Sequence, residues 1–314
     1  MPALVSILIP CYNAAPWLAA TLESALAQTW PHCEIILVDD GSKDDSLRIA
    51  ESFRARGVTV IAQANRGASA ARNAALRASR GDWIQFLDAD DLLAPHKIER
   101  QLAAAAREPG EFMRSARWAR FTGDPRTARF VPEALCCDAD PVTWTVLKLE
   151  QHAMMHPAAW LSPRALVDRA GPWDETLSLD DDGEYFTRLV LLSAGVRYCP
   201  DAVSFYRSQL TGSLSRSNSE RAWESALRVI EAVAARLLSQ EDSPRTRHAC
   251  AAAAQRFYFE SYPRAAAARR RAQALARRCG GAPEQRPTGG NKFHRLSRLL
   301  GWRLARRVQL ALEK

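Results

Sequence analysis

The feature that most constrains the fold is an alternation of short apolar runs with amphipathic stretches over residues 1–107. The apolar runs have the length of strands: Val5–Ile9, Ile35–Val38, Val58–Ala62 and Trp83–Leu87. The amphipathic stretches have the length of helices: Pro16–Gln28, Asp44–Arg56, Ala68–Ala78 and Pro95–Arg107. Apolar strands joined by helical crossovers predict an α/β fold, a mostly parallel central sheet with helices on both faces. Ligands of such sheets bind at the carboxyl ends of the strands.

The rest of the chain predicts a second half of the same domain, followed by helices. We expect a strand at Met113–Phe121, helices at Pro141–Glu150, Ser162–Ala170 and Asp182–Ser193, and short strands at Arg197–Cys199 and Val203–Tyr206. The stretch Glu220–Arg278 is rich in Ala and Arg and is expected to be helical. The predicted organisation is a domain over 1–215 with halves 1–107 and 108–215, a helical extension over 216–279, a linker over 280–291 and a basic amphipathic helix over 292–314.

The positive charge is concentrated at the end of the chain. Residues 264–314 hold fourteen Lys and Arg against two acids and carry +12, which leaves −4 on the preceding 263 residues and +8 in total. A uniformly basic protein would suggest nucleic-acid binding. A basic tail on a mildly acidic body predicts instead that the tail alone meets an anionic surface. We therefore expect no nucleic-acid partner.

Two partners fit the predicted helix 292–314. Its apolar residues repeat at intervals of three and four beside arginines: Phe293, Leu296, Leu300, Leu304, Val308 and Leu312. This stripe suits docking on the rest of the protein or on another subunit. It equally suits binding to an anionic membrane surface, which would make the protein peripheral on the inner face of the plasma membrane.

The apolar start of the chain and the spacing of its cysteines predict a cytoplasmic protein. No Lys or Arg precedes Lys43, so the apolar start lacks the positive region of a signal peptide. No run of ~18 apolar residues predicts a membrane span. Seven cysteines without CxxC spacing argue against a disulfide framework and against a zinc site.

Two acidic clusters follow predicted strands. Asp39 and Asp40 come directly after Val38, where a carboxylate can accept from an imide N–H or a ribose hydroxyl, or can simply cap the next helix. Asp88 and Asp90 follow Leu87 at a spacing that projects both side chains to the same side of an extended segment. Two such carboxylates with phosphate oxygens suit Mg²⁺ or Mn²⁺, and a solvated acidic turn is the alternative.

A third acidic cluster, Asp180–Glu184, opens the predicted helix 182–193. Capping and the helix dipole explain one acid at this position, but hardly three in a row. The remaining carboxylate is a candidate general base.

These clusters belong to a set of motifs that together resemble glycosyltransferase family 2. The motifs are SILIPCYNA (Ser6–Ala14), LESALAQTW (Leu22–Trp30), EIILVDDGSKDDS (Glu34–Ser46), NRGASAARNAAL (Asn65–Leu76), GDWIQFLDADD (Gly81–Asp91) and LDDDGEYFTRLV (Leu179–Val190). The resemblance runs from about Val5 to Tyr206 and implies a Rossmann-like GT-A fold. Residues 1–107 would then form the nucleotide-sugar-binding half and residues 108–215 the acceptor half.

The resemblance implies donor-site roles for residues in the first loops. Pro10, Tyr12 and Asn13 occupy the loop on which the nucleotide base packs. Asp40 matches the carboxylate that recognises a uracil-type N–H, and Asp39 supports it.

The resemblance also implies roles around the metal. Arg72 matches the basic residue that approaches the nucleotide. Asp88 and Asp90 match the Asp-x-Asp motif, with Asp90 as the main ligand of Mn²⁺ or Mg²⁺ and Asp88 as a ribose contact or supporting carboxylate.

In the third cluster the family pattern is Glu-Asp followed six residues later by Arg. Asp182 matches the catalytic base and Arg188 the arginine, while Asp181 replaces the usual Glu as the supporting acid. His156 and Trp160 fall where the family lines its acceptor cleft, in a segment whose pattern equally predicts a buried strand.

The implied activity is an inverting transfer of a sugar from a nucleotide diphosphate, by default UDP, to a hydroxyl. The acceptor would be a saccharide or lipid-linked saccharide of cell-envelope or extracellular polysaccharide synthesis. A dinucleotide-binding oxidoreductase would need G-x-G-x-x-G after the first strand, where this chain has Pro10–Ala14 without a glycine. A catalytically silent nucleotide-sugar-binding protein would usually have a broken acidic motif, and all three clusters are intact.

Overall fold

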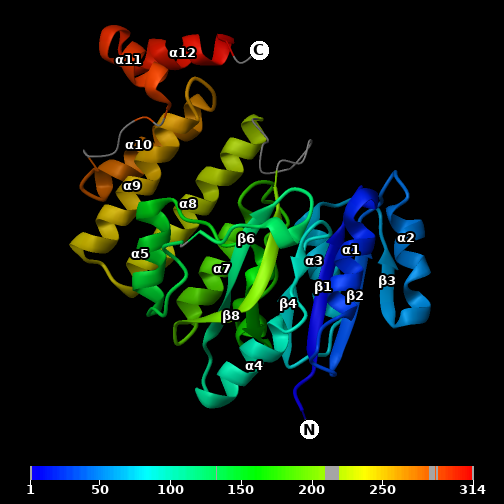
Figure 1. The fold of residues 1–314 in the computed structure, drawn as a ribbon. Helices are drawn as coiled ribbons and strands as arrows, with labels where there is room; N and C mark the ends of the chain where they lie inside the picture. The colour runs from blue at the N-terminus through cyan, green and yellow to red at the C-terminus, as the bar shows by residue number, and fades with distance from the viewer. Residues whose placement is uncertain (1, 132, 209–218, 283–286, 288, 313–314) are drawn as a thin grey trace.

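The computed structural model describes residues 2–131, 133–208, 219–282, 287 and 289–312. Within them, strands form one eight-stranded sheet in the order β3-β2-β1-β4-β7-β6-β8-β5 (Figure 1). The strands are β1 (Val5–Cys11), β2 (Cys33–Asp39), β3 (Val58–Ala62), β4 (Trp83–Phe86), β5 (Leu92–Leu93), β6 (Met113–Phe121), β7 (Trp160–Pro163) and β8 (Val196–Arg207).

The helices cover both faces of the sheet and continue beyond it. Those of the sheet domain are α1 (Ala15–Leu26), α2 (Ser46–Ser52), α3 (Ala68–Ala78), α4 (Lys97–Arg107), α5 (Pro141–Gln151), α6 (Arg164–Ala170) and α7 (Asp181–Leu192). Those that follow are α8 (Glu220–Gln240), α9 (Pro244–Glu260), α10 (Ala266–Arg278), α11 (Asn291–Leu300) and α12 (Trp302–Leu312). Short 3₁₀ turns lie at Arg54–Arg56, Pro125–Thr127 and Pro157–Ala159.

The parallel part of the sheet is buried on both faces, as its unbroken apolar runs predict. β1 pairs in parallel with β2 and β4, and β2 pairs in parallel with β3. Every residue of β1 is buried. Leu8 packs in the core under α3, while its neighbours Ile7 and Ile9 pack in the opposite core with residues of α1 and α2. The predicted mostly parallel α/β sheet is confirmed.

Side chains of α4 donate hydrogen bonds to backbone carbonyls near the junction of β4 and β7, which pair over only two residues. The buried Lys97 ammonium donates to the carbonyl of Trp160 at 3.0 Å and to the side chain of Gln85. Gln101 donates to the carbonyls of Arg114 and Ala159 at 3.0 and 3.2 Å. Carbonyls that would otherwise be buried without donors are therefore satisfied, although burial lowers the pKa of Lys97 well below its usual value.

The helical extension shares a core with the sheet domain. Leu149 of α5, Leu191 of α7, Val229 of α8 and Ala252 of α9 belong to one cluster of buried side chains. Figure 1 shows α8 and α9 standing beside α5 and α7. The predicted boundary at 215/216 lies outside the described residues, but the packing on either side of it is continuous.

Two details of the sheet domain differ from the predicted elements. β8 is one strand from Val196 to Arg207 instead of two. Its pairing with β6 shifts register between Ala116 and Arg117, opposite the interval between the two predicted strands. The predicted helix 162–170 is shorter because residues 160–163 pair with β4 and β6 as β7.

The predicted single helix 292–314 is wrong, because the segment contains two helices that break at Gly301. This glycine has φ +75°, a left-handed conformation that a continuous helix cannot contain. The indole of Trp302 then packs edge-on against the rings of Phe259 and Tyr262, at centroid distances of 5.1 and 5.0 Å. Docking of Trp302 on the extension explains the break. Within the described residues, no helix combines the length and apolarity that a membrane crossing requires.

Candidate active site

The loops after β1 and β2 are tied together by short polar side chains. Asn13, which has φ +49°, accepts from the amide of Lys43 at 2.7 Å, and its own amide donates to Ser42 at 3.0 Å. Pro10 is buried at the end of β1. Tyr12 is 50% exposed beside this junction. A rigid loop with one exposed aromatic ring is suited to stacking on a planar ligand.

Asp39 and Asp40 are both buried at the end of β2, with different surroundings. Asp40 accepts from the amides of Arg66 and Gly67, at 2.9 and 2.7 Å, and from Gln63 at 2.7 Å. It therefore holds the loop that leads into α3. Asp39 accepts from the amide of Ser42 through one oxygen, while its other oxygen, Oδ1, is buried without a partner among the described residues.

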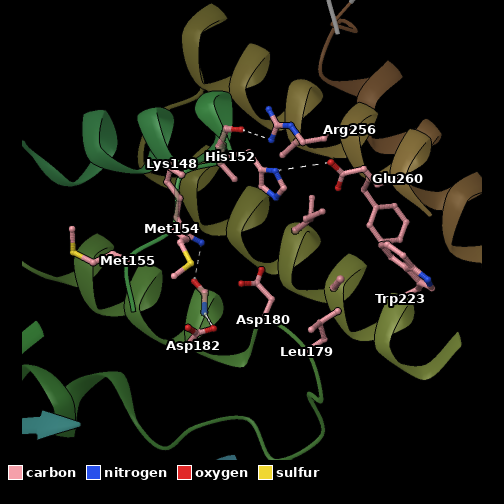
Figure 2. A pocket seen from close by; sticks show the side chains of 17 residues that line it. Lys148, His152, Met154, Met155, Leu179, Asp180, Asp182, Trp223, Arg256 and Glu260 are labelled. Atoms are coloured by element: carbon pink, nitrogen blue, oxygen red, sulfur yellow. Dashed lines mark hydrogen bonds and ion pairs between the residues drawn. The ribbon is translucent and has the colours of Figure 1, made fainter. Parts of the chain in front are cut away.

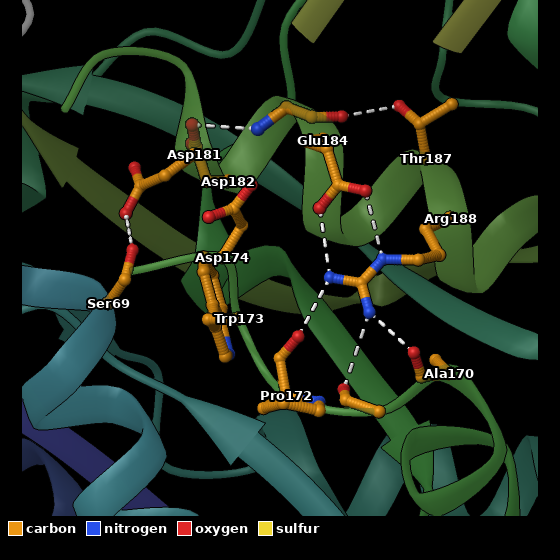
Figure 3. A network of polar contacts seen from close by, with 12 residues as sticks. Ser69, Ala170, Pro172, Trp173, Asp174, Asp181, Asp182, Glu184, Thr187 and Arg188 are labelled. Carbon is orange, nitrogen blue, oxygen red and sulfur yellow. Dashed lines mark hydrogen bonds and ion pairs between the residues drawn. The ribbon is translucent and has the colours of Figure 1, made fainter. Parts of the chain in front are cut away.

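Arg72 connects two of the predicted acidic clusters. From α3, its buried guanidinium donates to Asp88 at 2.8 Å and to Asp181 at 2.9 Å. Burial alone would lower the pKa of Arg72, but the two carboxylates outweigh it and raise it. The guanidinium also lies 4.5 Å from the ring of Trp173, and Ser69 donates to Asp181 at 2.7 Å (Figure 3). The structure therefore brings Arg72, Asp88 and Asp181 together.

The carboxylates of Asp90 and Asp91 differ in the hydrogen bonds that they accept. Asp91 is buried and accepts from the amide of Arg207 at 2.8 Å, with His156 Nδ1 at 2.9 Å. Among the described residues, the carboxylate of Asp90 accepts a hydrogen bond only from its own backbone amide. Desolvation, followed by the nearby Asp91 and Asp88, raises the pKa of Asp90 to about 8.

The donor set at this edge fits a hard divalent cation that takes further ligands from elsewhere. The carboxylate of Asp90 is unpaired and its neighbours repel it, and a cation would relieve both conditions. In the part of the chain that the structure describes, no three His, Cys, Asp or Glu side chains form a metal site by themselves. Diphosphate oxygens and water would therefore have to supply the remaining ligands.

Asp182 lies at the start of α7 in the wall of a cavity. One of its oxygens accepts from the amide of Gly183 at 2.9 Å. Desolvation, followed by repulsion from Asp181 and Asp180, raises its pKa to about 7, although Arg72 opposes the shift. A carboxyl group that titrates near neutral pH can accept a proton under physiological conditions.

Arg188 does not reach Asp181 or Asp182. It forms a two-point ion pair with Glu184 one turn away, both contacts being 2.9 Å, and donates to the carbonyl of Pro172 at 3.0 Å (Figure 3). Arg188 therefore fastens α7 to the loop that carries Trp173.

His156 and Trp160 are buried in the core. The two ring nitrogens of His156 contact Asp91 and Ser204, both at 2.9 Å, and burial lowers the pKa of His156 to about 3. Trp160 stacks on Phe186 at 5.6 Å. Neither side chain faces a cleft in the described structure, and the buried-strand alternative describes Trp160.

The sequence analysis did not predict the role of the loop that carries Trp173, whose ring packs against the guanidinium of Arg72. Trp173 stacks on Tyr185 with ring centroids 4.0 Å apart, and its backbone is held by Asn73, which accepts from its amide at 2.8 Å and donates to its carbonyl at 3.0 Å. The signal in the sequence that could have indicated this contact was Asn73, a polar residue that directly follows Arg72 in α3 and is buried there.

Comparison with known proteins shows which family the chain resembles. Residues 6–131 match the sequence profile of the family described as Glycosyl transferase family 2. A curated relative, the uncharacterized glycosyltransferase EpsJ of Bacillus subtilis, is 32% identical over 217 residues, which are 66% of this chain and 62% of that protein. The chain spans about three fifths of the length of the first curated relatives it matches.

Solved structures share the fold. The crystal structure of S. aureus TarS 1-349 in complex with UDP-GlcNAc has a TM-score of 0.65 at 17% identity, covering 88% of this chain and 92% of that one. The mannosyltransferase PcManGT from Pyrobaculum calidifontis, in complex with GDP-Man and Mn²⁺, has a TM-score of 0.54 at 18% identity, covering 100% and 88%.

Replacing Arg72 by Met should destabilise the protein by about 3 kcal/mol, because Asp88 and Asp181 lose a buried partner and repel each other. Arg66→Met is the matched control, since Arg66 pairs with Glu175 at the surface and its loss should cost less than about 1 kcal/mol. Urea denaturation of the two variants measures both values. Equal losses would show that the buried bridge has no special role.

Proposed function

The chain is a member of glycosyltransferase family 2 through residues 6–131, and on that premise we propose that it is an inverting enzyme that moves a sugar from a nucleotide diphosphate to a hydroxyl. The observation that carries the proposal is the Arg72 bridge. It joins Asp88 of the Asp-x-Asp motif to Asp181, directly beside Asp182. The carboxylates proposed to bind the metal and to accept the proton therefore lie close to one buried cation.

The proposed donor is a nucleotide diphosphate sugar, with UDP as the favoured nucleotide. Support comes from the exposed ring of Tyr12, the buried carboxylate of Asp40 and the unpartnered Oδ1 of Asp39 at the carboxyl edge of the sheet. An orphaned buried acceptor is costly unless a ligand supplies a donor, and an imide N–H or a ribose hydroxyl would do so. Of the structural neighbours, TarS is in complex with UDP-GlcNAc and PcManGT with GDP-Man, and both ligands are nucleotide diphosphate sugars.

Asp90, supported by Asp88, is the proposed ligand of Mg²⁺ or Mn²⁺. When bound, such a cation acts as a Lewis acid that neutralises charge on the departing diphosphate, so the leaving group needs no proton donor. The protein's own contribution is to hold the two carboxylates at the sheet edge, with Arg72 fixing Asp88.

Asp182 is the proposed general base. It takes the proton of the acceptor hydroxyl while that oxygen bonds to the anomeric carbon. The bond from this carbon to the diphosphate oxygen breaks, and its electron pair leaves with the diphosphate. Attack opposite the leaving group inverts the anomeric centre. Retention would need a second carboxylate as nucleophile, and Asp181 is engaged by Arg72 and Ser69.

The tail α11–α12 is proposed to bind an anionic membrane surface, near a lipid-linked or polysaccharide acceptor. Docking of Trp302 leaves Leu299 and Leu312 more than 80% exposed, beside the exposed Arg295 and Arg298. No acid occurs among residues 291–312. Exposed leucines flanked by arginines are the pattern of a helix lying in a lipid interface, where each basic residue adds ~1 kcal/mol.

Asp182→Asn should lower sugar transfer by about 10²-fold or more, since an amide keeps the shape but cannot take a proton. Affinity for the nucleotide diphosphate should persist. In the unaltered enzyme the rate should rise with pH through about 7, because the base works only when deprotonated. Rates across pH 5 to 9 and calorimetric binding test both expectations. Near-normal transfer by Asp182→Asn would move the base elsewhere, and binding without any transfer by the unaltered protein would mark a silent binder.

Asp90→Ala should abolish the dependence of nucleotide diphosphate binding on Mg²⁺ or Mn²⁺ and remove turnover. Without the cation, the carboxylates repel the diphosphate. Asp45→Ala, at an exposed surface acid, is the control and should change neither. Titration calorimetry with and without metal, together with nucleotide diphosphate release, provides the measurement. Full activity in excess chelator would eliminate the proposed metal.

The double variant Leu299→Ser, Leu312→Ser should weaken binding to phosphatidylglycerol vesicles by about tenfold or more, because two exposed apolar anchors are lost while the charge is unchanged. Phosphatidylcholine vesicles should bind neither protein tightly. Vesicle co-sedimentation gives the comparison. Unchanged binding to the anionic vesicles would favour a protein surface as the partner of the tail.

A further inference from the structure

A cavity of about 610 Å³ lies between the start of α7 and the helices α5, α8 and α9. Asp180 and Asp182 line it at the start of α7, Lys148 and His152 line it from the end of α5, and Glu260 lines it from α9 (Figure 2). Cavities of roughly 300–1,000 Å³ are the size of small-molecule sites in proteins. The proposed base thus faces a space whose walls come largely from the helical extension.

Asp180 is held in an unusual way for a residue at a helix start. It occupies the N-cap position of α7, but its side chain makes no cap hydrogen bond and its backbone is left-handed, with φ +60°. Such a conformation is uncommon outside glycine, although Asp adopts it more readily than most residues. Figure 2 shows the carboxylate pointing into the cavity. Its oxygens lie so close to Gly183 that an added Cβ there would come within 2.0 Å of Oδ1.

The extension holds the segment that ends in Asp180. The hydroxyl of Ser225, buried in α8, accepts from the amides of Ser178 and Leu179 at 2.9 and 3.0 Å and donates to the carbonyl of Leu179 at 2.9 Å. On the other side of the cavity, Arg256 of α9 donates to the carbonyls of Leu149 and Glu150. Both walls are therefore fastened to α8 and α9.

The lining is divided into an apolar part and a polar part. Trp223, Ile230 and Phe257 form the apolar wall, with Trp223 packed edge-on against Phe257 at 5.8 Å. Lys148, whose one hydrogen bond among the described residues is 3.5 Å long, and Glu260 supply a donor and acceptors. A pyranose ring matches this division, because its C–H face packs on aromatic side chains while its hydroxyls both donate and accept.

We infer that this cavity binds the terminal sugar of a saccharide acceptor, with Asp180 accepting from one of its hydroxyls beside Asp182, so that the extension selects the acceptor. The inference rests on the proposed function. The hydroxyl that reacts gives its proton to Asp182, as in the proposed transfer, and a neighbouring hydroxyl is held by Asp180. The cavity lies beyond residues 6–131, so acceptor choice is encoded outside the matched family segment.

The test fills the cavity from its α8 wall. Ala226→Trp places an indole in it, and Ala235→Trp, at an exposed position of the same helix, is the matched control. Binding of a panel of p-nitrophenyl monosaccharides is measured by saturation-transfer NMR. Release of nucleotide diphosphate is measured from UDP-sugars and GDP-sugars with and without the same glycosides. Ala226→Trp should lose glycoside binding and glycoside-stimulated release by at least tenfold relative to Ala235→Trp, with release to water equal in the two variants.

Asp180→Asn provides a second arm that leaves the cavity open. It should raise the KM for the glycoside at least fivefold while changing kcat less, because it removes the charged acceptor but leaves Asp182 in place. Glycoside binding retained by Ala226→Trp, or no binding of any glycoside to the unaltered protein, would overturn the inference. Absence of nucleotide diphosphate release from every UDP-sugar and every GDP-sugar would instead overturn the proposed function, while the binding arm would still decide what the cavity holds.

Discussion

Carboxylates crowd the edge of the sheet where β2 and β4 end, and the buried guanidinium of Arg72 holds part of that edge together. Its ion pairs with Asp88 and Asp181 join a turn after β4 to the start of α7, segments about ninety residues apart in the chain. Without this guanidinium the two carboxylates would repel each other, because the site is partly desolvated. The arrangement of α3, β4 and α7 therefore depends on this cation and on Trp173, which packs on it.

The same crowding gives the site its chemical character. For both Asp90 and Asp182, desolvation and neighbouring acids raise the pKa and favour the protonated form. The two groups differ in what would relieve them. A divalent cation suits Asp90, which stands in the Asp-x-Asp turn, whereas Asp182 faces a cavity in which a hydroxyl proton can be taken up. One electrostatic condition thus suits both of the proposed roles, metal binding by Asp90 and proton uptake by Asp182.

The sheet and its acidic edge were predictable because each rests on a local pattern. Strands buried on both faces must be apolar throughout, and β1 is a direct example. Contacts that cross the chain leave no such pattern. Ser225 looks like any polar helix residue until α8 packs on the loop before Asp180. The break at Gly301 likewise depends on the contact of Trp302 with an aromatic side chain of α9. The sequence does not reveal it, because the helical period of apolar residues continues on both sides of the glycine.

The hydrogen bonds between Ser225 and residues 178 and 179 determine which segments would have to be exchanged together in a chimera of related proteins. The extension and the loop before α7 share three hydrogen bonds through one hydroxyl. A chimera that exchanges α8–α10 alone would bring a foreign helix against the native loop and would shift the backbone that carries Asp180. The exchangeable unit is therefore the extension together with the segment from Trp173 to Asp182, although nearly forty residues separate the two in the chain.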